Sequence, residues 1–228
     1  MAHPTRLTAS TWTELVRPDR ALVVVPVGSC EQHGPHLPLD TDTVIACALA
    51  DELGRRRADC LVAPPITVTA SGEHQGFPGT LSVGTEIMAG TVVELARSAD
   101  WAAGVVFVNG HGGNATAMHR AVEVFEVERR RVLVWSPQVP GGDPHAGRTE
   151  TALMLALAPE RVRVDRAAAG PVPTLGELTR HGVRALSPNG VLGDPAGATA
   201  DDGDRIFAAL AEQLVAAVDT AVGGWADR

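Results

Sequence analysis

The stretch ALVVVPV at residues 21–27, followed at once by GSCEQHGPHLPLDTD at residues 28–42, decides the expected fold. Its first part is a continuous apolar run rich in valine, which is typical of a strand buried on both faces of a parallel sheet. Its second part is interrupted by glycine and proline and carries carboxylate and imidazole groups. We therefore expect a buried strand whose carboxyl end delivers polar side chains to the edge of a sheet, where ligand sites of open α/β sheets lie.

Three residues of the second part are candidate metal ligands, namely Glu31, His33 and Asp42. Glu31 and His33 are two residues apart, so an extended backbone directs both side chains to the same side. Asp42 precedes an apolar, helix-like run and could equally be an N-cap, and a Gly/Pro loop that contains histidine is often only a solvated turn. From these residues alone, a functional site and an ordinary loop both remain open.

Strand-like and helix-like segments alternate along the rest of the chain. Further strands are expected at residues 60–63, 104–108 and 132–135, and helices at residues 42–57, 85–101, 115–131, 146–157 and 205–222, after a short helix at residues 8–15. This alternation predicts an α/β fold of three layers, α/β/α, with a mostly parallel sheet and helices on both faces. Residues 71–80 and 180–204 are rich in turn-forming residues and are expected to be loops.

Length and composition indicate a single globular domain over residues 1–228. The formal net charge is −8, which argues against a nucleic-acid or anionic-membrane partner because both require a basic surface. The apolar runs are too short and too interrupted to span a bilayer. All 19 basic residues are arginine, so a lysine nucleophile or Schiff base is excluded.

The cysteines and the amino terminus indicate a reduced, cytoplasmic chain. Cys30, Cys47 and Cys60 are odd in number and form no Cys-x-x-Cys pair, which fits a cytosolic protein better than a disulfide framework. Residues 1–6 lack the apolar core of a secretory signal. A nucleophilic role for Cys30 is disfavoured, because a thiol nucleophile would not need the carboxylates around it.

Two more polar patches follow expected strands. In NGHGGN at residues 109–114, His111 lies at a strand-to-helix turn whose glycines let the backbone pack close to a ligand. The alternative there is an anion-binding turn with an incidental histidine. In DPHAGRTET at residues 143–151, His145 precedes a helix and Glu150 lies in its first turns, where a carboxylate can simply stabilise the helix start. Each patch alone leaves both interpretations open.

Together, the three patches place carboxylates and imidazoles at the strand ends of one sheet: Glu31, His33, Asp42, His111, His145 and Glu150. Two divalent cations need about this many O and N ligands, with one carboxylate bridging, and the mixture suits Zn²⁺, Fe²⁺ or Mn²⁺ rather than Ca²⁺. A serine triad is a weaker interpretation, because no Gly-x-Ser-x-Gly elbow occurs. We therefore expect a site for two metal ions.

The same motifs, with FPGT at residues 77–80, resemble the creatininase (creatinine amidohydrolase) family in order and over nearly the whole chain. The resemblance implies a cytosolic α/β/α metallohydrolase with two metals per subunit, assembled as a homohexamer or similar ring. It also implies roles for five residues, with metal ligands at Glu31, His33, Asp42 (bridging) and His111, and a catalytic histidine at His145.

The chain departs from the family pattern at one position. Creatininase itself has a ligand glutamate two residues after the histidine that matches His111, and this chain has Gly113 there. The resemblance then implies that Glu150 completes the second metal, as in the other branch of the family.

Within the family, the short link at residues 136–144 and the segment ALSPNGVLGDP at residues 185–195 are most similar to a peptidase subgroup. That similarity implies metal-dependent hydrolysis of an amide bond in a modified precursor peptide, which releases its C-terminal Val-Tyr-derived moiety. Hydrolysis of creatinine or of a formamide is one alternative. A non-catalytic, ring-forming binding protein that has lost its metals is another.

The short link also bears on access to the expected site. Residues 136–144 are too few to build a helical lid over the metals, so we expect a rim that is open to an extended chain end. Any mobile cover is expected to come from the Gly/Pro-rich loop at residues 187–197.

Overall fold

A four-stranded parallel sheet lies at the centre of the computed structural model, which describes residues 6–16 and 21–226. The strands are β1 (Leu22–Val27), β2 (Cys60–Val62), β3 (Gly104–Asn109) and β4 (Val132–Trp135), in the order β2-β1-β3-β4. Residues 1–5, on which most of the expectation about a secretory signal depends, lie outside the described residues.

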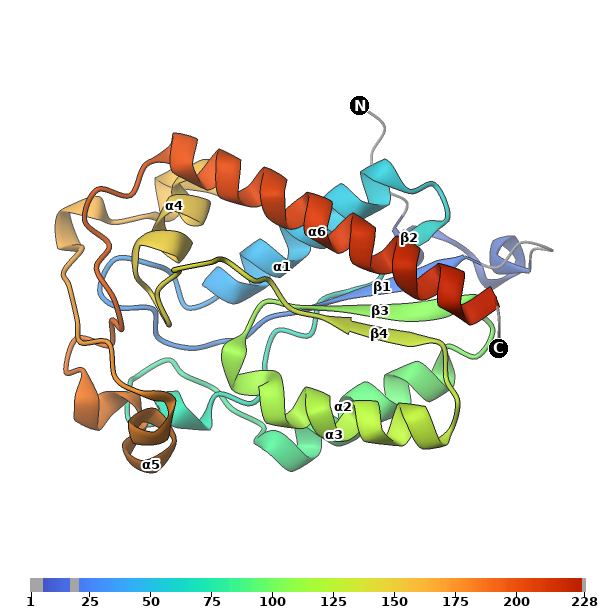
Figure 1. The fold of residues 1–228 in the computed structure, drawn as a ribbon, viewed down its shortest axis with the longest axis horizontal. Coiled ribbons are helices and arrows are strands. Elements are labelled where there is room, and N and C mark those ends of the chain that lie inside the picture. Colours follow the sequence, from blue (N-terminus) through green and yellow to red (C-terminus); the bar gives the residue numbers. More distant parts are fainter. Residues whose placement is uncertain (1–5, 17–20, 227–228) are drawn as a thin grey trace.

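Helices cover both faces of the sheet (Figure 1). They are α1 (Thr41–Arg56), α2 (Thr85–Ser98), α3 (Ala115–Val127), α4 (Arg148–Leu157), α5 (Leu175–Leu186) and α6 (Ala200–Ala226). α1, α4 and α6 pack together on one face, and α2 packs with α3 on the other. The expected α/β fold with a parallel sheet between two helical layers is therefore confirmed. Short 3-10 helices connect these elements: η1 (Leu7–Ala9), η2 (Trp12–Leu15), η3 (Gly72–His74), η4 (Gly112–Asn114), η5 (Pro159–Arg161) and η6 (Val164–Arg166).

The alternation of side chains along β1 explains why this strand has no polar position. Leu22 and Val24 belong to the core cluster beneath α1, α4 and α6, whereas Val23 and Val25 belong to the cluster beneath α2 and α3. Successive side chains of a strand point to opposite faces. A strand between two helical layers therefore buries every side chain, as the valine-rich run predicts.

The register of the sheet brings two of the polar patches together. Val27, the last residue of β1, is paired with Asn109, the last residue of β3. The chain therefore leaves both strands at the same edge of the sheet, which lies at the left in Figure 1. The loops that follow these strands start side by side at this edge.

The expected loop over residues 180–204 is wrong at both ends, because α5 extends to Leu186 and α6 begins at Ala200. A capping box opens α5, in which Thr174 and Glu177 satisfy each other's backbone N–H groups. Gly182 has a φ of 70° and kinks α5. The kink interrupts the helical pattern, which is why the sequence does not predict this helix. The expected helix at residues 8–15 is also wrong, since η1 and η2 lie there instead.

Within the described residues, α6 is long and apolar enough to cross a membrane by length and composition alone. Such a helix is weak evidence, because core helices of soluble proteins pass the same test. α6 packs against α1 and α4, and its Leu210, Leu214 and Val218 belong to the core cluster on that face. Only 22% of the apolar stretch is buried, so packing accounts for part of its apolar composition, and α6 does not meet the expectation that every apolar run is too short to span a bilayer.

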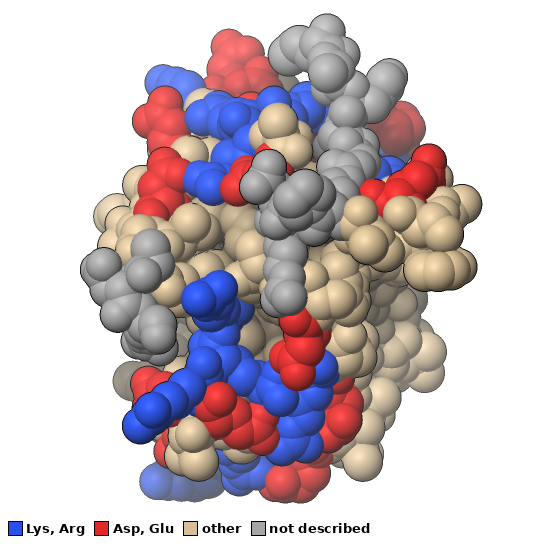
Figure 2. Space-filling model, turned by 90° about the vertical axis from the view of Figure 1, so that its right-hand side faces the viewer, with Lys and Arg blue, Asp and Glu red and all other residues tan. Residues whose placement is uncertain are grey.

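Charged side chains of both signs are interspersed on the face at the amino ends of the strands (Figure 2). Residues that flank those ends form ion pairs, with Arg57 Nη2 at 2.8 Å from Asp59 and Arg130 Nη1 at 2.5 Å from Asp100. Arg57 and Arg130 therefore have acidic partners beside them.

Candidate metal centre

All six residues selected from the sequence lie together at the carboxyl edge of the sheet. Glu31 and His33 lie in the loop after β1, Asp42 in the first turn of α1, His111 after β3, His145 before α4 and Glu150 in its first turn. Five of them are buried, and the side chain of Glu150 is 21% exposed. Loops and helix starts that are far apart in the sequence thus supply one cluster.

Two glycines let α1 approach the strand ends. A Cβ at Gly110 would lie 2.7 Å from the backbone oxygen of Asp42, and a Cβ at Gly28 would overlap Thr43. Neither glycine has a positive φ, so it is space rather than backbone conformation that requires glycine. The close approach carries Asp42 into the site.

Asp42 lies between two histidines. His33 Nε2 is 3.1 Å from Asp42 Oδ1, and His111 Nδ1 is 3.1 Å from Asp42 Oδ2. Ser29 Oγ donates a hydrogen bond of 2.8 Å to Oδ2. Each carboxylate oxygen of Asp42 therefore faces a different imidazole.

Two groups of potential ligands meet at Asp42. Donor atoms of Glu31, Asp42 and His111 lie within 4.8 Å of one another, and so do donor atoms of His33, Asp42 and Glu150. A carboxylate with one oxygen toward each group is arranged as a ligand that bridges two cations would be.

The carboxylate of Glu31 tests whether this cluster fits a metal. It is fully buried, and neither Oε1 nor Oε2 accepts a hydrogen bond from the described residues. Imidazole nitrogens lie beside it, with His111 Nε2 at 3.1 Å from Oε2 and His74 Nε2 at 3.3 Å from Oε1. A buried carboxylate whose oxygens complete no hydrogen bond is unfavourable. A divalent cation removes this penalty, and the mixed oxygen and nitrogen donors suit zinc or a transition metal.

The protonation of the metal-free cluster also indicates that the cluster suits a divalent cation. Burial disfavours charge on His33, but the Asp42 carboxylate outweighs it and raises the pKa of His33 to about 10. Burial likewise opposes charge on His111, whose pKa the Glu31 and Asp42 carboxylates raise to about 9. Burial raises the pKa of Glu31 to about 8. Without a metal, protons on His33, His111 and Glu31 balance the charges of the buried cluster.

His145 is held with one ring nitrogen toward Glu31. Its Nε2 lies 2.8 Å from the backbone oxygen of Gln32, which only accepts hydrogen bonds, and the two side-chain amide protons of Gln32 are directed to the Gly190 oxygen and His74 Nδ1, so we assign the ring proton to Nε2. Nδ1 then carries a lone pair and lies 3.8 Å from Glu31 Oε1. Burial, followed by the charge on His33, holds the pKa of His145 well below its usual range. The ring is therefore neutral.

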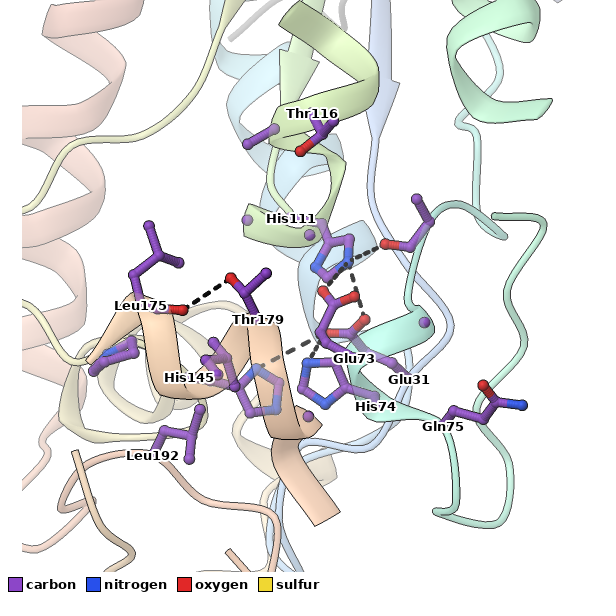
Figure 3. Close-up of a pocket in the computed structure, with 18 of the residues that line it drawn as sticks. Glu31, Glu73, His74, Gln75, His111, Thr116, His145, Leu175, Thr179 and Leu192 are labelled. Carbon is purple, nitrogen blue, oxygen red and sulfur yellow. Dashed lines mark hydrogen bonds and ion pairs between the residues drawn. The ribbon is translucent and has the colours of Figure 1, made fainter. Parts of the chain in front are cut away.

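Three further residues of the site were not selected from the sequence: Gln32, Glu73 and His74. Glu73 and His74 belong to η3, and Figure 3 shows both beside Glu31 and His111. Gln32 Nε2 lies 2.8 Å from His74 Nδ1 and 3.0 Å from His145 Nε2. The available signal was SGEH at residues 71–74, an acidic residue and a histidine in a glycine-containing loop, as in the other patches.

A cavity of about 1040 Å³ lies against this cluster (Figure 3). α5 supplies part of its wall through Leu175, Leu178, Thr179, His181 and Arg184. The expectation of a rim without a helical cover is therefore wrong, because the helix comes from a later segment than residues 136–144. From the loop at residues 187–197, Leu192 lines the cavity, and its backbone pairs with that of His145.

The model of the creatininase family, described as creatinine amidohydrolase, matches residues 8–218. The chain belongs to the creatininase family. A relative from Mycobacterium tuberculosis, named mycofactocin precursor peptide peptidase, is 51% identical over 208 residues, which are 85% of this chain and 82% of the relative. A relative of the same name from Mycolicibacterium smegmatis is 47% identical over 221 residues, which are 92% of this chain and 89% of the relative.

A solved creatininase structure agrees with the fold of the chain. The structure titled Creatininase Mn is 25% identical, with a TM-score of 0.76 over 94% of this chain and 97% of that one. Membership in the creatininase family confirms the resemblance seen in the sequence and the predicted class of enzyme, a hydrolase. The role of each residue in the cluster remains a prediction.

Proposed function

We propose that the chain is a dinuclear metal-dependent amide hydrolase that cleaves a modified mycofactocin precursor peptide and releases its C-terminal Val-Tyr-derived moiety. The observation that carries the proposal is the sharing of Asp42 by two groups of donor atoms beside the cavity. The relatives at 51% and 47% identity that are named mycofactocin precursor peptide peptidase support the choice of substrate.

The two groups would hold one divalent cation each. Glu31, Asp42 and His111 would bind the first, and His33, Asp42 and Glu150 would bind the second, with Zn²⁺, Fe²⁺ or Mn²⁺ as the candidate ions. When bound, the cations supply a Lewis acid for the amide carbonyl and activation of the attacking water.

His145 moves the proton in this mechanism. Its Nδ1 lone pair lies on the Glu31 side, where it can accept the proton of the attacking water. The imidazolium then donates that proton to the amide nitrogen, which leaves as an amine. The backbone oxygen of Gln32 keeps Nε2 protonated and stabilises the charged ring during the transfer.

Gln32 also orients a second ring. Its side-chain amide donates to the backbone oxygen of Gly190 at 2.9 Å and lies 2.8 Å from His74 Nδ1. The side-chain amide nitrogen of Gln32 can only donate hydrogen bonds. His74 Nδ1 is therefore the acceptor, and His74 Nε2 carries the ring proton. That proton lies on the Glu31 side, since Nε2 is 3.3 Å from Glu31 Oε1.

A direct comparison of substrates tests the proposal. We expect mass spectrometry to detect release of the C-terminal moiety from the modified precursor peptide, and no creatine from creatinine. If the protein instead hydrolyses creatinine or a formamide and leaves the precursor peptide intact, the alternative of a small-amide hydrolase is favoured. The description of the family model, creatinine amidohydrolase, agrees with that alternative.

Metal analysis separates the enzyme from a non-catalytic, ring-forming binding protein. An enzyme with this centre should be purified with two divalent cations per subunit. Less than about half an equivalent, with all candidate ligands intact, would favour the binding protein, because such sites normally bind tightly once their ligands are deprotonated.

We also propose a cytoplasmic, single-domain protein over residues 1–228 that assembles as a homohexamer or similar ring. The free thiols of Cys30, Cys47 and Cys60 support a reducing compartment. Mass photometry of the purified protein tests the assembly.

A further inference from the structure

Glu73 is a carboxylate at the cluster that the six predicted ligands do not include. Its Oε1 lies 3.5 Å from His111 Nε2, and its side chain is 25% exposed toward the cavity that it lines. Donor atoms of Glu31, Glu73 and His74 lie within 4.8 Å of one another. Figure 3 shows Glu73 next to Glu31 and His111, although it comes from η3. Glu73 thus reaches the same part of the cluster from a different loop.

The space that Glu73 uses is left free by Gly113. A Cβ at Gly113 would overlap both Glu73 Oε1 and His111 Nε2. Gly113 does not have a positive φ, so the backbone there does not itself require glycine. Glycine at position 113 is therefore explained by three close neighbours, namely His111, the backbone oxygen of Ala70 and the Glu73 carboxylate, which occupies part of the space of the missing side chain.

The backbone that carries Glu73 is fixed from two sides. Ala70 N donates a hydrogen bond of 3.1 Å to Asn114 Oδ1, which ties this segment to the turn after β3. α5 packs on η3, and a Cβ at Gly182 would lie 3.2 Å from the backbone oxygen of Glu73. These contacts hold the carboxylate close to His111.

We propose that Glu73 is a further metal ligand, which binds the cation beside Glu31 through the space that Gly113 leaves free. The inference rests on the proposed metal centre. The buried oxygens of Glu31 complete no hydrogen bond within the described residues, which favours a cation in this part of the cluster, and carboxylate oxygen is a suitable donor for the candidate metals. The exposed side of Glu73 puts this ligand on the cavity side of the cation.

Metal binding by the variant Glu73→Gln tests this directly. Glutamine keeps the size of the side chain and removes its charge, so the metal-free variant should keep the melting temperature of the parent. We expect its affinity for one of the two Zn²⁺ ions to fall by at least about tenfold in competition with a chelator. Glu86→Gln is the matched control, because Glu86 is 79% exposed on α2 and pairs with Arg120. The control should bind Zn²⁺ as the parent does.

Shortening the side chain provides an independent test. Glu73→Ala removes the carboxylate and should weaken binding of the same ion as Glu73→Gln does. Glu73→Asp keeps the charge on a side chain that is one methylene shorter and should bind that ion more tightly than Glu73→Ala.

Each outcome has one interpretation. If the parent binds two metals and Glu73→Gln binds both with unchanged affinity, Glu73 is not a ligand and only this inference fails. If Glu73→Gln weakens binding but Glu73→Asp binds no more tightly than Glu73→Ala, the carboxylate is not the donor and the inference is refuted. If the parent itself binds no metal, the proposed function fails.

Discussion

Asp42 Oδ2 lies 3.1 Å from His111 Nδ1, so that the first turn of α1 meets the loop after β3. The other oxygen of Asp42 lies at the same distance from His33 Nε2. One carboxylate therefore joins the two halves of the cluster. Any change to Asp42 should affect both proposed metals together, whereas a change to His33 or His111 should affect chiefly one.

The variant Asp42→Asn tests this difference. Asparagine keeps the shape of the side chain but loses the charge and the bridging ability, so we expect the affinity for both cations to fall by at least about a hundredfold. Metal analysis after gel filtration measures the loss. His33→Asn should retain the cation of the Glu31 group. Two tightly bound metals in Asp42→Asn would contradict a bridging role.

Metal affinity should rise with pH. In the metal-free protein, the pKa of His33 is raised to about 10 and that of His111 to about 9, so both rings are protonated at pH 6 to 8. A cation needs their lone pairs and must displace these protons. Affinity should therefore increase by up to about tenfold per pH unit for each displaced proton. Chelator competition between pH 6 and 8 measures the slope, and a flat profile would show that binding displaces no proton.

Gly110→Ala should displace α1 from the strand ends, because the new Cβ would lie 2.7 Å from the backbone oxygen of Asp42. We expect a loss of about 1–3 kcal/mol in the free energy of unfolding, typical of overpacking, together with weaker metal binding. Gly112→Ala is the matched control, because a Cβ there has no neighbour within 4 Å. Its stability should stay within about 0.5 kcal/mol of the parent. Equal urea midpoints for the two variants would contradict the packing argument.

The wall formed by α5 should contribute to peptide binding. Leu175 is 78% exposed and lines the cavity. Leu175→Ser should raise KM for the modified precursor peptide several-fold, because apolar contact with the substrate is lost, while metal content stays unchanged. Val127→Ser is the control, since Val127 is 85% exposed at the end of α3 and does not line the cavity. An unchanged KM for Leu175→Ser would assign substrate contacts to other parts of the wall.

The sheet and the six candidate residues were predictable from local sequence patterns. The valine-rich run of β1 and the apolar β3 follow from burial on both faces, and parallel strands carry the residues that follow them to a common edge. The topology of the sheet therefore places Glu31 and His111 close together, independently of the contacts between their side chains.

Glu73, His74 and α5 were not predictable in this way. The SGEH segment has no periodicity, and its position depends on tertiary contacts with Asn114 and Gly182. The kink at Gly182 also prevents the prediction of α5 from the sequence, because it divides the helical pattern into two short pieces. The cover of the cavity is thus a result of packing between loops, which a local pattern does not encode.

Cleavage of the modified precursor peptide before and after metal removal tests the central claim most directly. The protein is treated with a chelator, its fold is checked by circular dichroism, and release of the C-terminal moiety is followed by mass spectrometry as Zn²⁺, Fe²⁺ or Mn²⁺ is returned. We predict no cleavage by the folded, metal-free protein and full recovery as the second equivalent per subunit is added. Cleavage at the original rate by the metal-free protein would contradict the account.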